Sequence, residues 1–160
     1  MSEQKVHAEP KTPAEFYKLG QTLYRGGYFG QALTVFEKGL DLAPGDPRFV
    51  SYIGVLTALV RRDVKKALEL CRKAIDEQPY VGQWYVNLAT VYEKSRRKDE
   101  AVDVLRRGLV AENGHRELLS MLKKLQPRRK PVIGSLDRDH PINKLLGMFS
   151  YRLAAKKKAS

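Results

Sequence analysis

The chain has 160 residues, and its 30 Lys and Arg residues against 18 Asp and Glu residues give a net charge of +12 at pH 7. This length is sufficient for one sizeable hydrophobic core. No apolar run approaches the roughly 20 residues that span a bilayer, and the polar residues 1–11 lack the apolar stretch of a secretory signal, so we expect a cytoplasmic protein.

Capping and turn residues place the expected helix ends. Thr12 with Pro13 and Glu15 has the sequence of a capping box with proline in the first turn, and Asp46 before Pro47 is a second helix start. Residues 26–27 and 61–63 fall in tight turns between paired helices. We expect helices at about 13–25, 29–42, 47–61, 64–77, 82–95 and 98–112, followed by an amphipathic capping helix at 116–126.

Three segments of this helical region repeat one another at a spacing of 34 to 35 residues. Each unit is one helical hairpin, which cannot bury its apolar stripe alone, so the copies stack around a shared core. The spacing therefore predicts an all-α protein. The residues in register are Ala32, Ala67 and Ala101; Phe36, Cys71 and Leu105; Gly39, Ala74 and Gly108; Leu40, Ile75 and Leu109; and Pro44, Pro79 and Asn113.

The middle unit departs from the regular spacing. Gly54 lies 34 residues after Gly20, whereas Ala67 lies 35 residues after Ala32. One residue has therefore been inserted, either before the unit at Pro47 or in its turn at 61–63. The helix at 47–61 is also apolar nearly all round, which is typical of a helix covered on every side. We expect the neighbouring hairpins to cover part of it and the remainder to face a concave groove.

The chain abandons the repeat after about residue 115. We expect a flexible N-terminus at 1–12, a basic linker with Pro, Gly and Ser at 127–139, an amphipathic helix at 140–155 and a basic tail at 156–160. The amphipathic helix can pack on the repeats, lie on an anionic membrane, or dock on a partner or a second copy of the chain. We favour packing on the repeats, with the groove as one site, because the 13-residue linker reaches roughly 40 Å when extended. Its apolar face comprises Ile142, Leu145, Leu146, Phe149 and Leu153.

Positive charge is concentrated at the C-terminal end. Residues 116–160 hold 12 Lys and Arg against three Asp and Glu, whereas residues 1–115 hold 18 against 15. Basic clusters attract acidic protein surfaces, anionic lipid or nucleic acid, and they also occur as solvated ends that keep a protein soluble. The sequence leaves these alternatives open. The two clusters are Arg128, Arg129 and Lys130, and Lys156, Lys157 and Lys158.

The repeat resembles the tetratricopeptide repeat, whose pattern is an aromatic residue, Leu-Gly, Tyr, Ala, an aromatic residue and Pro. Leu19 and Gly20, followed by Ala32, Phe36 and Pro44, come close to this pattern. The resemblance implies a right-handed superhelical stack of three hairpins, at about 13–46, 47–81 and 82–115, in which the first helix of each hairpin lines a concave groove. On this basis the groove residues are Tyr17, Gln21, Tyr24, Tyr52, Leu56, Leu59, Val86, Asn87 and Thr90.

The resemblance also bears on the ligand. Tetratricopeptide proteins that clamp the C-terminal carboxylate of heat-shock chaperones use Lys, Asn and Arg in the groove. Here Asn87 alone is at a matching place, while Tyr17 and Gln21 replace the Lys and Asn of the first helix. We therefore expect an amphipathic helix or an extended apolar segment as the ligand rather than a carboxylate.

The sequence gives little support to catalysis. His7, His115 and His140 are scattered, and Cys71 occupies a core position of the repeat and has no partner for an internal disulfide. We expect no catalytic residue, no metal site and no cofactor. The predicted function is a non-enzymatic scaffold or adaptor that binds a protein or peptide. The alternatives are a secretion-type chaperone, which the chain resembles in repeat count and length only, and an adaptor to anionic membrane or nucleic acid through the basic tail.

Overall fold

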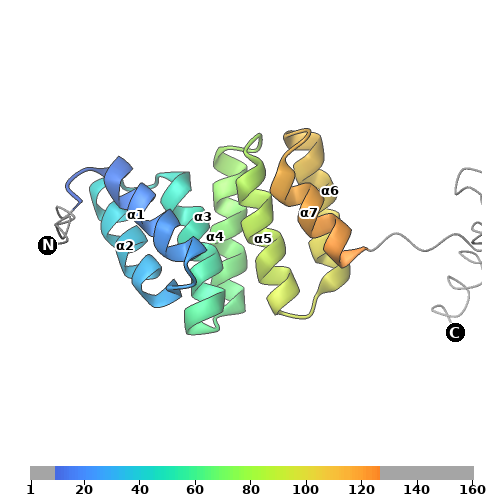
Figure 1. Ribbon diagram of the computed structural model, residues 1–160, viewed down its shortest axis with the longest axis horizontal. Coiled ribbons are helices and arrows are strands. Elements are labelled where there is room, and N and C mark those ends of the chain that lie inside the picture. The colour runs from blue at the N-terminus through green and yellow to red at the C-terminus, as the bar shows by residue number, and fades with distance from the viewer. Residues whose placement is uncertain (1–9, 127–160) are drawn as a thin grey trace, which may run out of the picture. The chain divides into compact units, whose positions relative to one another are not determined.

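A computed structural model describes residues 10–126, and every regular element in this range is a helix. Three antiparallel hairpins stack side by side, and a seventh α-helix follows the third hairpin (Figure 1). The predicted all-α stack of hairpins is confirmed, and the expected helix ranges agree with the structure to within one residue at each end. The helices are α1 (Pro13–Arg25), α2 (Phe29–Leu42), α3 (Pro47–Leu56), the π-helix η1 (Thr57–Arg61), α4 (Val64–Glu77), α5 (Gly82–Lys94), α6 (Lys98–Ala111) and α7 (Arg116–Leu125).

The two capping predictions for α1 and α3 are confirmed. The backbone N–H of Glu15 donates to Thr12 Oγ1 at 3.3 Å, and the backbone N–H of Thr12 donates to Glu15 Oε2 at 3.1 Å. At the start of α3 the backbone N–H of Arg48 donates to Asp46 Oδ1 at 2.9 Å. These bonds satisfy N–H groups that have no partner inside the helix, which is why the chain turns into helix at these residues.

Each of the first two hairpins closes where a glycine on its first helix meets a side chain of its second helix. A Cβ atom added to Gly20 would lie 2.5 Å from Cε1 of Phe36, and one added to Gly54 would lie 2.7 Å from Sγ of Cys71. Neither distance leaves room for a methyl group, so glycine permits the close approach of the two helices. Gly54 therefore holds the same place in the middle hairpin as Gly20 holds in the first.

This equivalence locates the inserted residue. Residues with positive φ end the first helix of each hairpin, and they are Gly27 at 79°, Arg62 at 58° and Arg96 at 61°. Gly27 is seven residues beyond Gly20, whereas Arg62 is eight residues beyond Gly54. The additional residue therefore lies between Gly54 and Arg62, where η1 accommodates it, since a π-helical turn takes up one residue more than an α-helical turn. Insertion at Pro47 is excluded, and the insertion precedes the turn rather than lying within it.

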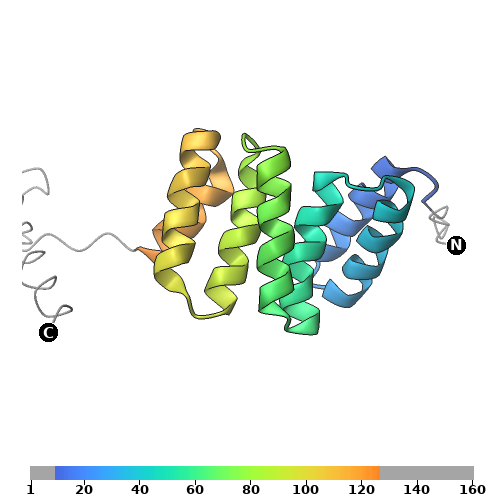
Figure 2. The ribbon, with the colours of Figure 1, turned by 180° about the vertical axis from the view of Figure 1, so that it is seen from behind.

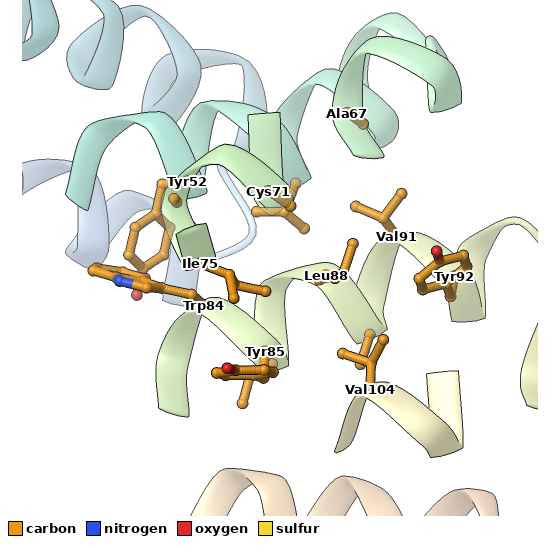
Figure 3. Close-up of a cluster of buried hydrophobic side chains, with 14 of the residues drawn as sticks. Tyr52, Ala67, Cys71, Ile75, Trp84, Tyr85, Leu88, Val91, Tyr92 and Val104 are labelled. Carbon is orange, nitrogen blue, oxygen red and sulfur yellow. The ribbon is translucent and has the colours of Figure 1, made fainter. Parts of the chain in front are cut away.

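Neighbouring hairpins interlock through aromatic and aliphatic side chains. The ring of Phe49 on α3 packs against Gly39 on α2, and Tyr85 on α5 and Leu118 on α7 pack against Gly108 on α6. Figure 3 shows the junction of the middle and third hairpins, where side chains of α3, α4, α5 and α6 gather. One continuous hydrophobic core thus runs through the described helices.

The middle helix α3 is covered on every side. All residues from Phe49 to Thr57 are buried. The expectation that part of the helix at 47–61 faces the groove is wrong for Phe49–Thr57, because side chains of both neighbouring first helices lie against them, whereas Leu59 in η1 is half-buried. Tyr17 of α1 packs edge-on against Phe49 and Tyr52, and Asn87 of α5 reaches Ser51.

The remaining expectations for the chain lie outside the described residues. These are the N-terminal residues up to 9, the linker at 127–139, the amphipathic helix at 140–155 and the basic tail. Among the helices of residues 10–126, none is long and apolar enough to cross a membrane.

Candidate functional site

The first helices of the hairpins line one face of the stack. α5 packs against α3 on one side and α7 on the other, whereas the second helices α2, α4 and α6 make no comparable contacts with one another within residues 10–126. Because α3, α5 and α7 lie closer together than the second helices do, the stack curves toward the first helices. We call the surface formed by α1, α3, α5 and α7 the concave face.

The structure divides the nine predicted groove residues into two groups. Five are half-buried, and their role in binding stays a prediction: Tyr17, Gln21, Tyr24, Leu59 and Thr90. The other four are buried: Tyr52 at 4% exposure, Val86 at 3%, and Leu56 and Asn87 at 0%. The prediction is wrong for Leu56 and Asn87, which have no accessible surface with which to touch a ligand.

Asn87 is fixed by hydrogen bonds inside the core. Its Nδ2 donates to Ser51 Oγ at 2.9 Å, and its Oδ1 accepts from Gln83 Nε2 at 3.2 Å. A buried amide with both ends bonded joins α5 to α3 and has a structural role. The one residue that matched the carboxylate-clamping pattern is therefore not available to a carboxylate.

A tyrosine cluster occupies the concave face between α1 and α3. The ring of Tyr52 lies 5.8 Å from that of Tyr17 and 5.3 Å from that of Tyr24, both edge-on, and Gln21 Nε2 donates to the Tyr52 hydroxyl at 3.3 Å. Edge-to-face geometry at these distances is favourable for aromatic rings. Three phenol groups from two hairpins thus meet at one place.

The electrostatics of this cluster keep its hydroxyls neutral. Burial raises the pKa of Tyr17, Tyr24 and Tyr52 above its usual value, and the Glu117 carboxylate of α7 adds to the rise in the pKa of Tyr24 and Tyr52. The Arg48 guanidinium, 5.5 Å from the centre of the Tyr17 ring, partly opposes the rise in the pKa of Tyr17. Neutral phenols next to apolar rings suit a ligand that offers apolar side chains and backbone hydrogen-bonding groups.

The sequence analysis missed the contribution of α7 to this face. Glu117, Ser120 and Lys124 lie 34 residues after Gln83, Val86 and Thr90, so they occupy the corresponding places of a fourth first helix. All three are exposed, and Lys124 Nζ lies 2.9 Å from Glu93 Oε1. Extending the 34-residue spacing by one helix would have identified them.

The described residues hold no metal-binding cluster, and their one cysteine is buried. No group of three His, Cys, Asp or Glu side chains within residues 10–126 could hold a metal ion. Cys71 is buried, and burial raises the pKa of its thiol to about 12, which disfavours the reactive thiolate. The prediction that Cys71 is a core residue is confirmed.

The architecture defines a class of protein, the helical-hairpin solenoid with a concave face built from its first helices. Two segments, residues 16–46 and 85–117, match family models described as tetratricopeptide repeat. The chain is a tetratricopeptide-repeat protein. The matched segments leave the middle hairpin between them, which is the hairpin with the inserted residue and the fully buried first helix.

Curated relatives match this chain over a small part of their own length. The chain is 28% identical over 89 residues to an inactive TPR repeat-containing thioredoxin of Arabidopsis thaliana. The match covers 55% of this chain and 13% of that protein. It is 27% identical over 118 residues to the Hsp70-Hsp90 organising protein of Plasmodium falciparum, covering 69% of this chain and 21% of that protein. The chain therefore matches a small part of each relative.

Solved structures show the same fold at low identity. The first TPR domain of Spaghetti (RPAP3), bound to an HSP90 peptide, has a TM-score of 0.56 at 18% identity and covers 75% of this chain and 94% of that chain. A TPR protein of Thermus thermophilus has a TM-score of 0.61 at 21% identity, with 71% and 64% of the two chains covered. The TPR2B domain of yeast Sti1, in complex with an Hsp70 peptide, has a TM-score of 0.57 at 21% identity, with 73% and 98% covered.

Proposed function

We propose that this protein is a non-enzymatic adaptor that binds a peptide or helix of a partner protein on its concave face. The observation that carries the proposal is that four predicted groove residues, Tyr17, Gln21 and Tyr24 of α1 and Leu59 of η1, are half-buried. These side chains leave apolar and aromatic surface accessible beside a rigid core. Such surface is typical of sites that hold an apolar segment of another protein.

The comparisons support a protein partner. Two of the similar structures, the RPAP3 domain and the Sti1 domain, hold chaperone peptides. The repeat fold recurs in them with most of each domain covered, so a peptide is a suitable ligand for this chain as well.

The chemistry of the concave face favours an apolar or amphipathic segment over a terminal carboxylate. Tyr17 and Gln21 bring no positive charge, and Asn87 is enclosed in the core. Residues 140–155 of this chain have the composition of such a ligand, with a run of large apolar residues at helical spacing. We propose this segment as an internal ligand that competes with the partner.

The variant Leu59→Arg tests the proposed face. It places a charge in the strip, so partner binding should fall at least tenfold, as expected for a cation introduced into an apolar contact. The matched control is Val110→Arg, because Val110 lies on α6 at 88% exposure and away from the first helices. We expect the wild type and Val110→Arg to capture proteins from a lysate that Leu59→Arg does not capture. Equal capture by all three proteins contradicts the proposal, provided that thermal melts show them equally folded.

The internal-ligand proposal has a separate test. A synthetic peptide of residues 140–155 should bind a chain truncated after residue 126 and should displace the captured partner. If the peptide binds neither the truncated chain nor its Leu59→Arg variant, the internal-ligand proposal is wrong. The proposed adaptor function does not depend on this result.

A further inference from the structure

Charge is distributed unevenly between the two long edges of the stack. The turns within the hairpins lie along the lower edge in Figures 1 and 2, and the connections between hairpins lie along the upper edge. We call the first the turn edge (25–31, 60–66 and 94–100) and the second the connection edge (41–48, 76–82 and 111–117). The turn edge carries nine Lys and Arg against three Asp and Glu, whereas the connection edge carries two against six.

Two arginines on the turn edge occupy a backbone conformation that favours glycine. Gly27, Arg62 and Arg96 hold the corresponding place in the three turns, with φ of 79°, 58° and 61°. A Cβ atom in this left-handed region crowds the following carbonyl, and the residue is seldom other than Gly or Asn. The presence of arginine in two of the three turns, at a place where glycine is easier to accommodate, indicates a use for its side chain.

The side chains of these two arginines are free to act. Both are exposed, and neither forms an ion pair with any of residues 10–126. Their neighbours are engaged, since Arg61 pairs with Glu37 at 2.6 Å and Arg97 pairs with Glu100 at 2.8 Å. Further exposed cations without an ion pair in the described range lie on the same edge: Arg25, Lys65, Lys66, Lys94 and Lys98.

Large apolar side chains are exposed on the same edge. Tyr28 is 61% exposed, Val60 42% and Phe29 36%, in the turns of the first two hairpins. Aromatic and aliphatic side chains next to Lys and Arg are typical of surfaces that rest in the headgroup region of a bilayer.

We propose that the turn edge docks on an anionic lipid surface. The three turns lie along one edge of the stack (Figure 1), so a membrane at this edge would meet cations at its headgroups and Tyr28 and Phe29 at its interface. A single-stranded nucleic acid is bound instead in a groove that follows its backbone. The turn edge adjoins the concave face, because the ring of Phe29 lies 5.6 Å from that of Tyr24.

The test replaces Arg62 and Arg96 with glycine, the residue that the first hairpin has at the corresponding place, Gly27. The full-length double variant Arg62→Gly/Arg96→Gly removes two charges and relieves the backbone, so its melting temperature should not fall. Binding is measured by flotation with vesicles of phosphatidylcholine and phosphatidylglycerol. Each cation contributes about fivefold near such a surface, so the double variant should bind about 25-fold more weakly. Binding of the wild type should also fall steeply with added salt.

A charge-matched control separates the turn edge from net charge. Lys38→Gln/Arg107→Gln removes two exposed cations from other parts of α2 and α6, and it should change vesicle binding less than twofold. An equal loss in the two double variants shows that overall charge alone drives binding and overturns the proposal.

Two further measurements distinguish an anionic lipid surface from a nucleic acid. Vesicles of phosphatidylcholine alone should bind weakly, and Tyr28→Ser should weaken binding to anionic vesicles severalfold while leaving binding to a single-stranded oligonucleotide unchanged. If Arg62→Gly/Arg96→Gly loses oligonucleotide binding but keeps vesicle binding, nucleic acid is the partner of this edge and the lipid proposal is wrong.

Discussion

The middle hairpin packs its two helices in the same way as the hairpins on either side of it, but with a different number of residues. In all three, a left-handed residue ends the first helix, and in the first two a glycine lies where the two helices meet. The middle hairpin reaches the left-handed residue one position later, through the π-helix η1. An insertion can therefore be taken up within one helical turn, which leaves the contacts before and after it in register.

The two junctions between hairpins differ as well. The first junction is held by aromatic rings, with Phe36 and Tyr52 stacked at a centroid distance of 4.7 Å. The second contains the buried Asn87 to Ser51 hydrogen bond. Aromatic packing tolerates small shifts, whereas a buried polar pair requires correct geometry, so the second junction fixes the position of the third hairpin more strictly.

The largest expected effect on folding comes from deleting a single residue, and it should depend on whether the residue lies in η1 or in a regular helix. Deletion of Val60 from η1 should convert the π-turn to an α-turn and leave a folded protein. Deletion of Leu70 from the regular helix α4 rotates each later residue by about 100°, which takes Cys71, Ala74 and Ile75 off the buried face, so this variant should not fold. Circular dichroism and thermal melting distinguish the two. A Val60 deletion as unfolded as the Leu70 deletion contradicts the assignment of the insertion.

Gly54→Val should be the next most damaging change. Its Cβ would lie 2.7 Å from Cys71 Sγ, 3.1 Å from the Cys71 backbone nitrogen and 3.2 Å from the Ala67 carbonyl oxygen. The free energy of unfolding should fall by about 3 kcal/mol, since the backbone atoms cannot move aside. Gly30→Ala is the control, because nothing lies within 4 Å of its added Cβ, and it should stabilise α2 by about 0.5 to 1 kcal/mol. Urea denaturation provides both values.

Asn87→Ala should destabilise the second junction by about 1 to 3 kcal/mol, because Ser51 loses its buried partner. At the first junction Gln21→Ala removes a longer bond of 3.3 Å to Tyr52 from a half-buried site, and it should cost about 0.5 kcal/mol. The double variant Ser51→Ala/Asn87→Ala should be less destabilised than the sum of its single variants. Additive losses would show that the hydrogen bond does not couple the two helices.

The smallest expected effect concerns alkaline pH. Burial raises the pKa of Tyr24 in the folded protein, so the unfolded chain ionises first, near the ordinary tyrosine pKa of about 10. The stabilisation is fully present below that pH and is lost as the pH rises through the folded pKa. Unfolding free energy should therefore decline above about pH 10, and less steeply in Tyr24→Phe. Denaturation midpoints measured across this range test it, and identical slopes for the two proteins would exclude a contribution from Tyr24.

Helix positions were predictable because the relevant interactions are local. The Thr12 capping box and the Asp46 cap before Pro47 act within a few residues, and α1 and α3 begin where these caps place them. The candidate site was predicted less well. Tyr17 and Tyr24 are half-buried as a binding face requires, whereas Leu56 and Asn87 are enclosed.

The repeating hairpins, their order and the presence of one inserted residue can be read from the amino-acid sequence, because each depends on spacing along the chain. The tertiary structure alone decided where the insertion is absorbed, which side chains of α3 remain accessible and which charges share an edge. These depend on how far Tyr17 and Asn87 reach across from neighbouring helices, over 30 residues away in sequence from the residues that they cover. Spacing fixes the direction of a side chain, but exposure is set by its neighbours in space.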